Sequence, residues 1–489
     1  MWTKESLQKL VKEDFKDYKF ILVSNREPFL HTFDKNHKIK CERSVGGVSI
    51  SFDSIMKATK GTWVAYGGSS ADKKVVDEND HIKMPPNNHQ YTLRRVWMTE
   101  EERKGYYEGF SNEMLWPLCH TAFVRPKFEE SDWQKYKLIN KRFAEAILEE
   151  IKGKKAIVWI QDYQLALVAK YVKEKRPDAL VAQFWHIPWP ANEIFRICPW
   201  KKEILIGLLS NDLFGFHRYY HVDNFLKNVS KELEAKVDYE DLTIDYKNKK
   251  IKVGFFPISI DNEDVIRRLR NKDNFQAIIK KYIPFSYNIL ALGLDRVDYT
   301  KGIPNRLFAI EKFLAKNPKY IGKFVYLGIG APSRSGIAAY KNLNREVNKI
   351  VEKINNKFKK NDWRPIIYYN QVFKHQEIIE IMRHGDICLV TPLDDGMNLV
   401  AKEYIVANDG NGALVLSEFA GASKELTEAF LINPYDIKGT AKAIQVAIEM
   451  PSEEKRKKIA KMKELIKEKN LFRWAGKFLQ ELARLKKEK

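Results

Sequence analysis

The amino-acid sequence predicts an α/β protein of two Rossmann-like domains, and three observations support this fold class. Short apolar runs typical of buried parallel strands alternate with amphipathic helical segments along nearly the whole chain. Glycine-containing loops follow several of these runs and lead directly into helices. At 489 residues the chain exceeds what one ordinary core accommodates, so two domains of roughly 200 to 250 residues are expected.

The carboxyl ends of the predicted strands supply the first candidate site residues, because ligands of open parallel sheets bind there. Arg26 follows the first predicted strand, and Asp162 and His186 end two later ones. A lone histidine is more often structural, but His186 is followed by two prolines at a strand end, which favours a functional position. The strands of this first series are expected within residues 19–25, 61–69, 92–98, 156–164, 180–190 and 211–217, some of which include the loop that follows, with residues 249–261 as last strand and hinge.

Two further stretches of the first half contain candidate ligand groups. The paired glycines of residues 46–49 (GGVS) open a helix that ends near Ala58, and such a pair lets backbone N–H groups approach a phosphate or sugar, although most pairs are only turns. Residues 105–120 (GYYEGFSNEMLWPLCH) place Tyr107, Asn112 and Trp116 close together. Aromatic stripes are more often core, but aromatic rings beside polar groups suit a carbohydrate pocket.

A second series of strands and helices follows the hinge. Its alternation predicts a second Rossmann-like domain that faces the first across a cleft. The tail from Glu453 is expected to be mainly helical, with residues 473–485 crossing back onto the first domain. The strands of this series are expected within residues 288–302, 323–336, 365–370, 386–392 and 413–421, and the first two ranges include the loop that follows the strand.

Residues 394–398 (DDGMN) connect a predicted strand to a predicted helix. Gly396 permits a tight turn, and the free N–H groups of the opening helix form a ready anion site. Glu403 lies just over one turn into the helix, from where its carboxylate can reach a ligand. The alternative is an ordinary strand–helix connection with solvated acidic residues.

Basic residues after strands suggest phosphate recognition. Arg296 and Lys301, with Gly302, suit a nucleotide diphosphate, because two cations neutralise the charge that develops as the diphosphate leaves. Arg26 and Arg334, from opposite domains, are expected to clamp a second phosphate bidentately. The alternative for each loop is a solvated basic surface.

Composition bounds the class of protein. Lysine and arginine give a formal net charge of +21, but the excess is spread along the chain and mixed with glutamate, so a nucleic-acid role is the weakest alternative. No apolar run reaches the roughly 18 residues of a membrane span, and the amphipathic N-terminus lacks a signal-peptide core. We expect a cytoplasmic protein without a metal site, because there is no Asp-x-Asp motif and the four cysteines form no CxxC pair.

Nine motifs in order resemble the trehalose-6-phosphate synthase family: NREP, GGVS, YEGFSNEMLWPLCH, QDYQL, HIPWP, FPISID, LDRVDYTKGIPNR, APSRSG and DGMNLVAKEY. The resemblance covers nearly the whole chain. It implies a metal-independent retaining glycosyltransferase of GT-B type, without a cofactor. Residues 1–261 would form the acceptor-binding domain, residues 262–468 the nucleotide-sugar domain, and residues 469–489 a helix packing back on the first.

The resemblance also implies roles for individual residues. Arg296 and Lys301 would bind the diphosphate, Glu403 the ribose hydroxyls, and His186 and Asp395 the transferred glucose. The remaining donor-binding residues would be Gly47, Asn398 and Leu399. The acceptor would be held by Arg26, Tyr66, Tyr107, Trp116, Asp162 and Arg334. The leaving diphosphate would accept the proton of the acceptor on the same face.

The chain departs from the family pattern at several of these motifs. The family's HDYHL is here QDYQL, with Gln161 and Gln164, and RDGMN is DDGMN, with Asp394 beside the donor. Tyr66 replaces the tryptophan expected at the acceptor wall, and Glu108 stands where related proteins have Asn or Trp. These changes bear on which nucleotide the donor carries and on which phosphorylated acceptor is used.

The leading functional prediction is transfer of glucose from a nucleotide-glucose, UDP-glucose first, to glucose 6-phosphate, giving α,α-trehalose 6-phosphate. Tyr66 and Glu108 keep open a glucosylglycerol-phosphate synthase that uses glycerol 3-phosphate. A non-catalytic homologue that senses a sugar phosphate is a further alternative. A separate phosphatase is expected to act on the product, and a homo-oligomer is left open.

Overall fold

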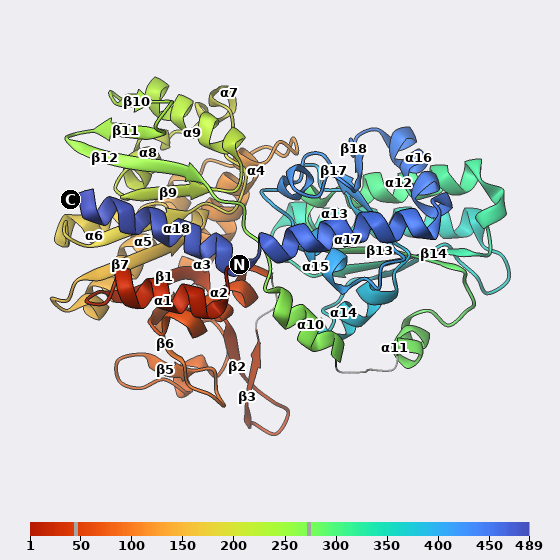
Figure 1. The fold of residues 1–489 in the computed structure, drawn as a ribbon, viewed down its shortest axis with the longest axis horizontal. Helices are drawn as coiled ribbons and strands as arrows, with labels where there is room; N and C mark the ends of the chain where they lie inside the picture. Colours follow the sequence, from red (N-terminus) through yellow and green to blue (C-terminus); the bar gives the residue numbers. More distant parts are fainter. Residues whose placement is uncertain (44–46, 271–274, 489) are drawn as a thin grey trace. The chain divides into compact units, whose positions relative to one another are not determined.

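The structure is a computed structural model that describes residues 1–43, 47–270 and 275–488. The chain folds into two compact units (Figure 1). The first unit comprises Met1–Ile258 and Leu471–Lys489, and the second comprises Ser259–Asn470. The predicted boundaries were residues 261 and 468. Within the described residues, no helix is both long and apolar enough to cross a membrane.

In the part of the chain that is described, the first unit is built on a ten-stranded sheet of order β10-β11-β12-β9-β8-β7-β1-β4-β6-β5. The strands from β12 to β6 are parallel, while β5, β10 and β11 pair antiparallel at the two ends. The sheet strands are β1 Lys19–Arg26, β4 Thr62–Tyr66, β5 His81–Met84, β6 Tyr91–Val96, β7 Ala156–Gln161, β8 Leu180–Phe184, β9 Leu213–Phe216, β10 Lys236–Asp238, β11 Thr243–Tyr246 and β12 Lys249–Phe255.

Helices cover both faces of this sheet, and a separate hairpin of β2 Phe29–Phe33 and β3 Ile39–Arg43 occupies the polar stretch after β1. The predicted helix after the paired glycines is α2, which begins at Gly47 and ends at Thr59, while Gly46 lies outside the described residues. The helices are α1 Lys4–Asp14, α2 Gly47–Thr59, α3 Glu100–Arg103, α4 Trp116–Cys119, α5 Glu130–Ile151, α6 Val168–Lys175, α7 Asn192–Phe195, α8 Lys201–Leu208, α9 Tyr219–Glu232 and α18 Leu471–Glu488.

The helix α18 packs in the first unit, as predicted for the C-terminal segment. It contacts α1, α2, β8 and β9, and in Figure 1 it runs beside α1. Phe478 stacks on Trp159 of the central strand β7 at 5.0 Å, and Trp474 lies 5.2 Å from the same ring. Burial of such large rings is a major source of stability, so α18 completes the core of this unit.

In the second unit, the described residues form a six-stranded parallel sheet of order β15-β14-β13-β16-β17-β18. Numbered along the chain within the unit, this order is the 3-2-1-4-5-6 arrangement of a doubly wound Rossmann fold. The central strands are almost completely buried on both faces, as parallel strands under helices must be. The strands are β13 Ile289–Arg296, β14 Phe324–Ala331, β15 Ile366–Tyr369, β16 Ile387–Val390, β17 Ala413–Ser417 and β18 Phe430–Ile432.

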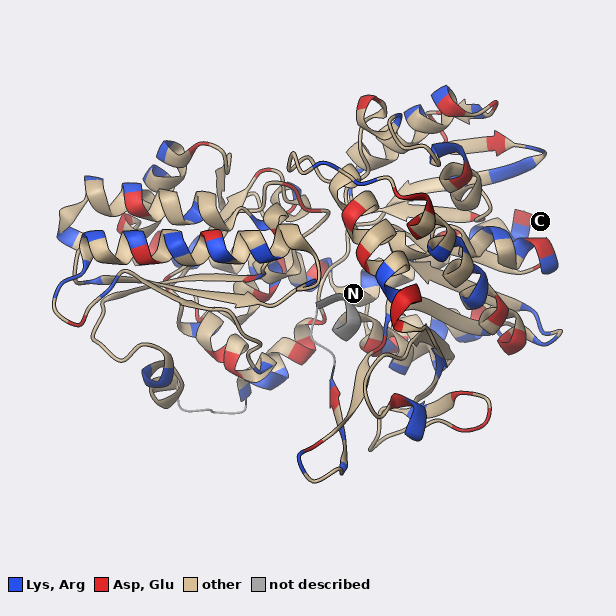
Figure 2. Cartoon of the chain, turned by 180° about the vertical axis from the view of Figure 1, so that it is seen from behind, with Lys and Arg blue, Asp and Glu red and all other residues tan. Residues whose placement is uncertain are grey.

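The helices of the second unit connect these strands and enclose a core of aliphatic and aromatic side chains. The α/β fold class and the two Rossmann-like sheets predicted from the sequence are thus confirmed. Figure 2 shows acidic and basic residues interspersed on the helices, as expected from the mixed sequence. The helices are α10 Asn262–Arg270, α11 Phe275–Tyr282, α12 Ile303–Lys316, α13 Ala338–Phe358, α14 His375–His384, α15 Leu399–Ala407, α16 Ile437–Glu449 and α17 Ser452–Glu468.

Candidate active site

The first unit gathers predicted site residues at the carboxyl ends of neighbouring parallel strands. Arg26 is the last residue of β1, Tyr66 the last of β4, Asp162 follows β7, and His186 lies two residues after β8. The strand order reverses between β1 and β7, so this edge contains the switch point where Rossmann-like sheets bind ligands. We call Arg26, Tyr66, Tyr107, Asp162 and His186 the first-unit site.

Tyr107 joins this site through a π-helical run, Lys104–Leu115, a form often found at functional positions. Arg26 donates from Nη2 to the Tyr107 hydroxyl at 3.1 Å. Asn112, expected from the sequence to be a pocket group, is instead 1% exposed and donates to the Tyr107 carbonyl at 2.6 Å. Its Oδ1 accepts from the Tyr163 hydroxyl at 2.8 Å, so it braces the site rather than lining it. Trp116 is also buried, with its ring 5.8 Å from that of Tyr163.

Asp162 has an unusual backbone conformation, with φ 73° and ψ 176°. Its N–H donates to the Phe184 carbonyl at 2.7 Å, and its own carbonyl accepts from Gln183 Nε2 at 3.1 Å. Its Oδ1 accepts from the His186 backbone N–H at 3.2 Å. Such strain costs of order 1–3 kcal/mol in a non-glycine residue and concentrates at functional sites. Arg334 and Asn398, also predicted site residues, likewise have positive φ.

The second unit repeats this arrangement at its own switch point, between β13 and β16. Arg296 is the last residue of β13 and Lys301 lies in the turn that follows. Asp395 lies in the loop after β16, and Arg334 in the loop after the neighbouring β14. We call these residues, together with those that begin α15, the second-unit site: Arg296, Lys301, Arg334, Asp395, Asn398, Leu399 and Glu403.

Lys301 and Asp395 form a close ion pair in this site. Lys301 Nζ lies 2.6 Å from Asp395 Oδ2, which also accepts from Asn398 Nδ2 at 3.1 Å. Asn398 is the N-cap of α15, and its Oδ1 accepts from the Ala401 N–H at 3.2 Å. The cation and the loop at the helix N-terminus are therefore fixed to each other.

Gly302 fixes the turn that carries Lys301. Its φ is 61°, and a Cβ at this position would collide with the Thr391 carbonyl at the end of β16. Only glycine adopts this conformation readily and also allows such close approach. The turn is therefore held against the neighbouring strand.

Asp298 is a site residue that the sequence reasoning missed. It is completely buried and accepts from Arg334 Nη1 at 3.0 Å, and from the Thr300 N–H and hydroxyl at 3.1 and 3.0 Å. Burial raises its pKa, but Arg334, Arg296 and Lys301 outweigh this effect and hold the pKa below its ordinary value. The sequence feature that could have indicated Asp298 is its place between Arg296 and Lys301 in LDRVDYTKG.

Arg334 is correspondingly enclosed, with a side-chain exposed fraction of 2%. Its guanidinium lies against Asp298 and also donates to the Tyr340 hydroxyl. The orientation of the Arg334 guanidinium is therefore already set by a buried carboxylate.

Glu403 lies on α15 with a side-chain exposed fraction of 14%, and His375 Nε2 is 3.9 Å from its Oε1. Burial raises its pKa to about 7, with a further upward contribution from Asp264 and a downward one from Arg268. A carboxylate in this position can accept two hydroxyl groups when it is ionised, but only weakly when it is protonated. Leu399 is the first residue of the same helix.

Tyr66 and Glu108, two departures from the family pattern, both lie near Arg103 in the first unit. Arg103 donates from Nη2 to Glu108 at 2.8 Å and from Nε to Glu100 at 2.8 Å. Burial raises the pKa of Tyr66, and Arg103 opposes this rise. Glu108 therefore binds Arg103, whose positive charge lies near Tyr66.

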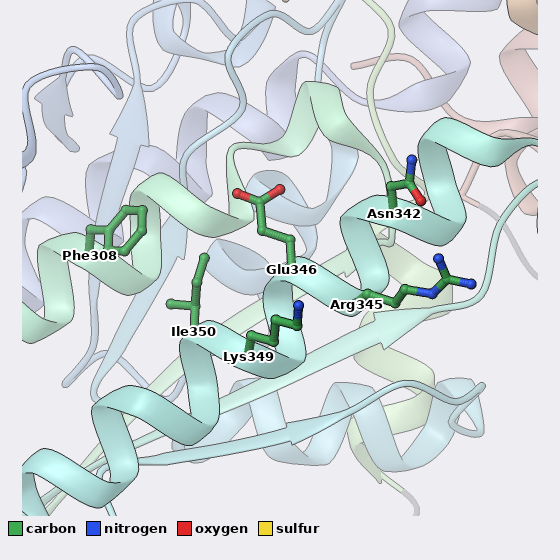
Figure 3. A pocket seen from close by; sticks show the side chains of 6 residues that line it. All are labelled: Phe308, Asn342, Arg345, Glu346, Lys349 and Ile350. Carbon is green, nitrogen blue, oxygen red and sulfur yellow. The ribbon is translucent and has the colours of Figure 1, made fainter.

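Other features of the described residues lie apart from these sites. Figure 3 shows a hollow between α12 and α13, and its lining includes none of the predicted site residues: Phe308, Asn342, Arg345, Glu346, Lys349 and Ile350. Among the described residues, no three His, Cys, Asp or Glu side chains are grouped to hold a metal ion. All four cysteines are free.

Comparison with known proteins identifies the family. The model of glycosyltransferase family 20 matches residues 18–484. A trehalose-6-phosphate synthase from Mycobacterium avium is 35% identical over 95% of this chain and 95% of its own. A bifunctional trehalose-6-phosphate synthase/phosphatase from Thermoproteus tenax is 34% identical over 95% of this chain, which spans 63% of that relative.

Solved structures agree with these relatives. A trehalose-6-phosphate protein from E. coli, bound with UDP-2-fluoro glucose, superposes with a TM-score of 0.84 at 29% identity, covering 95% of this chain and 99% of the other. A UDP-forming α,α-trehalose-phosphate synthase from Burkholderia xenovorans, in complex with glucose-6-phosphate, has a TM-score of 0.84 at 27% identity over 95% and 99% of the chains. Sequence match and fold together show that this chain belongs to glycosyltransferase family 20, the trehalose-6-phosphate synthase family.

Proposed function

We propose that the chain transfers glucose from UDP-glucose to glucose 6-phosphate and forms α,α-trehalose 6-phosphate with retention of configuration. The observation that carries this proposal is the family match over residues 18–484, with the motif residues at the switch points of both sheets. The substrates named for the E. coli and B. xenovorans relatives, a UDP-sugar and glucose-6-phosphate, support the choice of donor and acceptor.

In this proposal the second-unit site binds the nucleotide-sugar. Arg296 and Lys301 neutralise the diphosphate, and Lys301 exchanges part of its contact with Asp395 for the ligand. Glu403 accepts the ribose hydroxyls, and the loop of Asn398 and Leu399 presents the N-terminus of α15 to the donor.

The first-unit site would bind the acceptor and the glucose to be transferred. Arg26 and Tyr107 would bind the acceptor phosphate, and Asp162 would accept a hydrogen bond from an acceptor hydroxyl. Tyr66 and Trp116 complete this acceptor set, Gly47 and Asp395 contact the donor, and His186 holds a glucose hydroxyl. Catalysis rests on positioning and on charge stabilisation, with the leaving diphosphate accepting the proton of the acceptor, so no enzyme nucleophile is needed.

We further propose that the reaction needs no metal or other cofactor, because Arg296 and Lys301 supply the positive charge that a metal would otherwise bring. A separate phosphatase would act on the product, and the protein would work in the cytoplasm. Activity that persists in EDTA supports a metal-independent reaction. Activity that EDTA abolishes and Mg²⁺ restores contradicts it.

The decisive experiment offers UDP-, ADP- and GDP-glucose in turn with glucose 6-phosphate or glycerol 3-phosphate, and identifies products by mass and anomeric configuration. An α,α-linked disaccharide phosphate establishes the proposal and identifies the preferred base. Glucosylglycerol phosphate would show that Tyr66, Glu108 and Arg103 have reshaped the acceptor pocket. No transfer to either acceptor would favour a sugar-phosphate sensor.

A further inference from the structure

His186 lies in an aromatic pocket of the first unit. Its ring centroid is 4.7 Å from Phe184, 5.7 Å from Phe52 and 6.0 Å from Trp474, and the ring of His217 is 5.2 Å away. The residue is 8% exposed, and burial lowers its pKa to about 3. The imidazole is therefore neutral at working pH and carries a proton on only one of its nitrogens.

Gln161 contacts the polar edge of this ring. Its Oε1 lies 2.9 Å from His186 Nε2, and the side chain is itself almost completely buried at the end of β7. In the described part of the chain, His186 Nδ1 is buried without a hydrogen-bond partner. A carbonyl oxygen only accepts, so this contact places the proton on Nε2 and leaves the lone pair on Nδ1.

We propose that Gln161 is a positioning residue that holds His186 in the Nε2–H tautomer, so that Nδ1 accepts a hydrogen bond from a sugar hydroxyl. The identity of that sugar rests on the proposed function, whereas the tautomer does not. A carboxamide does not titrate, so the arrangement persists over the working pH range. The histidine that the family's HDYHL motif has at this position brings a protonation equilibrium of its own.

The tautomer is tested by ¹⁵N NMR of the full chain labelled at histidine, with His186 assigned from the spectrum of His186→Asn. The wild-type signal should show a proton on Nε2 between about pH 6 and about pH 9. In Gln161→Leu the preference should disappear. A proton on Nδ1 in the wild type, or an unchanged Nε2–H signal in Gln161→Leu, overturns the proposal.

A second variant keeps the test valid if Gln161→Leu fails to fold. Gln161→Glu retains an acceptor oxygen, so it should keep the Nε2–H tautomer and raise the pKa of His186, because a carboxylate favours the imidazolium. An unchanged titration of His186 in this variant would contradict the contact.

Steady-state kinetics separate positioning from a merely structural role. Gln161→Leu should raise the donor KM about tenfold, whereas the matched control Gln164→Leu, in the same motif and also buried, should not. An equal effect of both variants would show loss of packing alone. If the wild type transfers no glucose, the proposed function fails while the NMR result still decides the tautomer.

Discussion

The two sites of this protein use the same position in two similar sheets for different electrostatic purposes. In the second-unit site two cations already have internal ion-pair partners: Lys301 pairs with Asp395, and Arg334 pairs with Asp298. Around the His186 ring the first-unit site presents uncharged groups, namely aromatic rings, a carboxamide and a histidine whose pKa is about 3, while the Asp162 carboxylate contacts the His186 backbone N–H. The ion pairs of the second-unit site suit a charged ligand that displaces an internal partner. The uncharged groups around His186 in the first-unit site suit hydroxyl groups, which need directed hydrogen bonds.

The largest effect should follow loss of a second-unit cation. We expect Lys301→Ala to lower turnover about 10³-fold, because the developing charge of the leaving diphosphate loses a preorganised partner. Arg296→Ala should behave similarly. The measurement is the rate of glucosyl transfer, with circular dichroism to show that each variant is folded. Lys316→Ala is the control, because Lys316 is an exposed residue of α12. Near-normal activity of Lys301→Ala or Arg296→Ala would show that these cations do not stabilise the leaving diphosphate.

Removal of the buried carboxylate should affect both stability and rate. Asp298→Asn leaves Arg334 without its charged partner, so we expect a loss of about 3 kcal/mol of stability and about 100-fold in kcat/KM. Urea unfolding and kinetics are the measurements, and the exposed Asp362→Asn serves as control. A loss of stability with unchanged kinetics would assign Asp298 to the fold alone.

The pH dependence of donor binding distinguishes the sites further. Because the pKa of Glu403 is about 7, its ionised fraction should fall about tenfold between pH 8 and pH 6, and the donor KM should rise by a similar factor. Glu403→Gln should flatten this profile. The same raised pKa means that the contribution of Glu403 to stability falls as the pH rises from about 4.5 to about 7, since the unfolded chain ionises first.

The smallest effect is expected at the acceptor wall. Tyr66→Trp combined with Glu108→Asn removes the Glu108 partner of Arg103 and restores the family pattern. We expect the preference for glucose 6-phosphate over glycerol 3-phosphate to change about fivefold. The ratio of kcat/KM for the two acceptors is the measurement. An unchanged ratio would show that these departures do not determine the acceptor.

The sequence predicted the central parallel strands of both sheets, because buried parallel strands are short apolar runs that loops interrupt. Arg26, Asp162 and His186 therefore lie at the sheet edge where the strand pattern placed them. The sequence did not predict the shorter or more peripheral strands β2, β3, β5, β10, β11 and β18. The final strand of the first unit, expected over residues 249–261, ends at Phe255. The chain then leaves the sheet before the boundary at Ile258.

Other features had no adequate local signal. The π-helical run Lys104–Leu115 resembles any aromatic stretch in sequence, and Asn112 was therefore assigned to a pocket that it does not line. The importance of Asp298 depends on Arg334, which lies on a different strand connection. The contact of Gln161 with His186 likewise joins two strands. Pairings between distant segments depend on the tertiary fold rather than on local pattern.

The position of α18 has a consequence for the order in which the protein is made. The second unit is continuous from Ser259 to Asn470, so all of it emerges from the ribosome before α18 does. The first unit, although synthesised first, lacks Trp474 and Phe478 against Trp159 until then. Domains usually complete folding in the order of their synthesis. Here the unit that is synthesised first cannot complete its core until α18 is made, so a ribosome stalled before Leu471 holds a nascent chain whose N-terminal unit lacks these two rings.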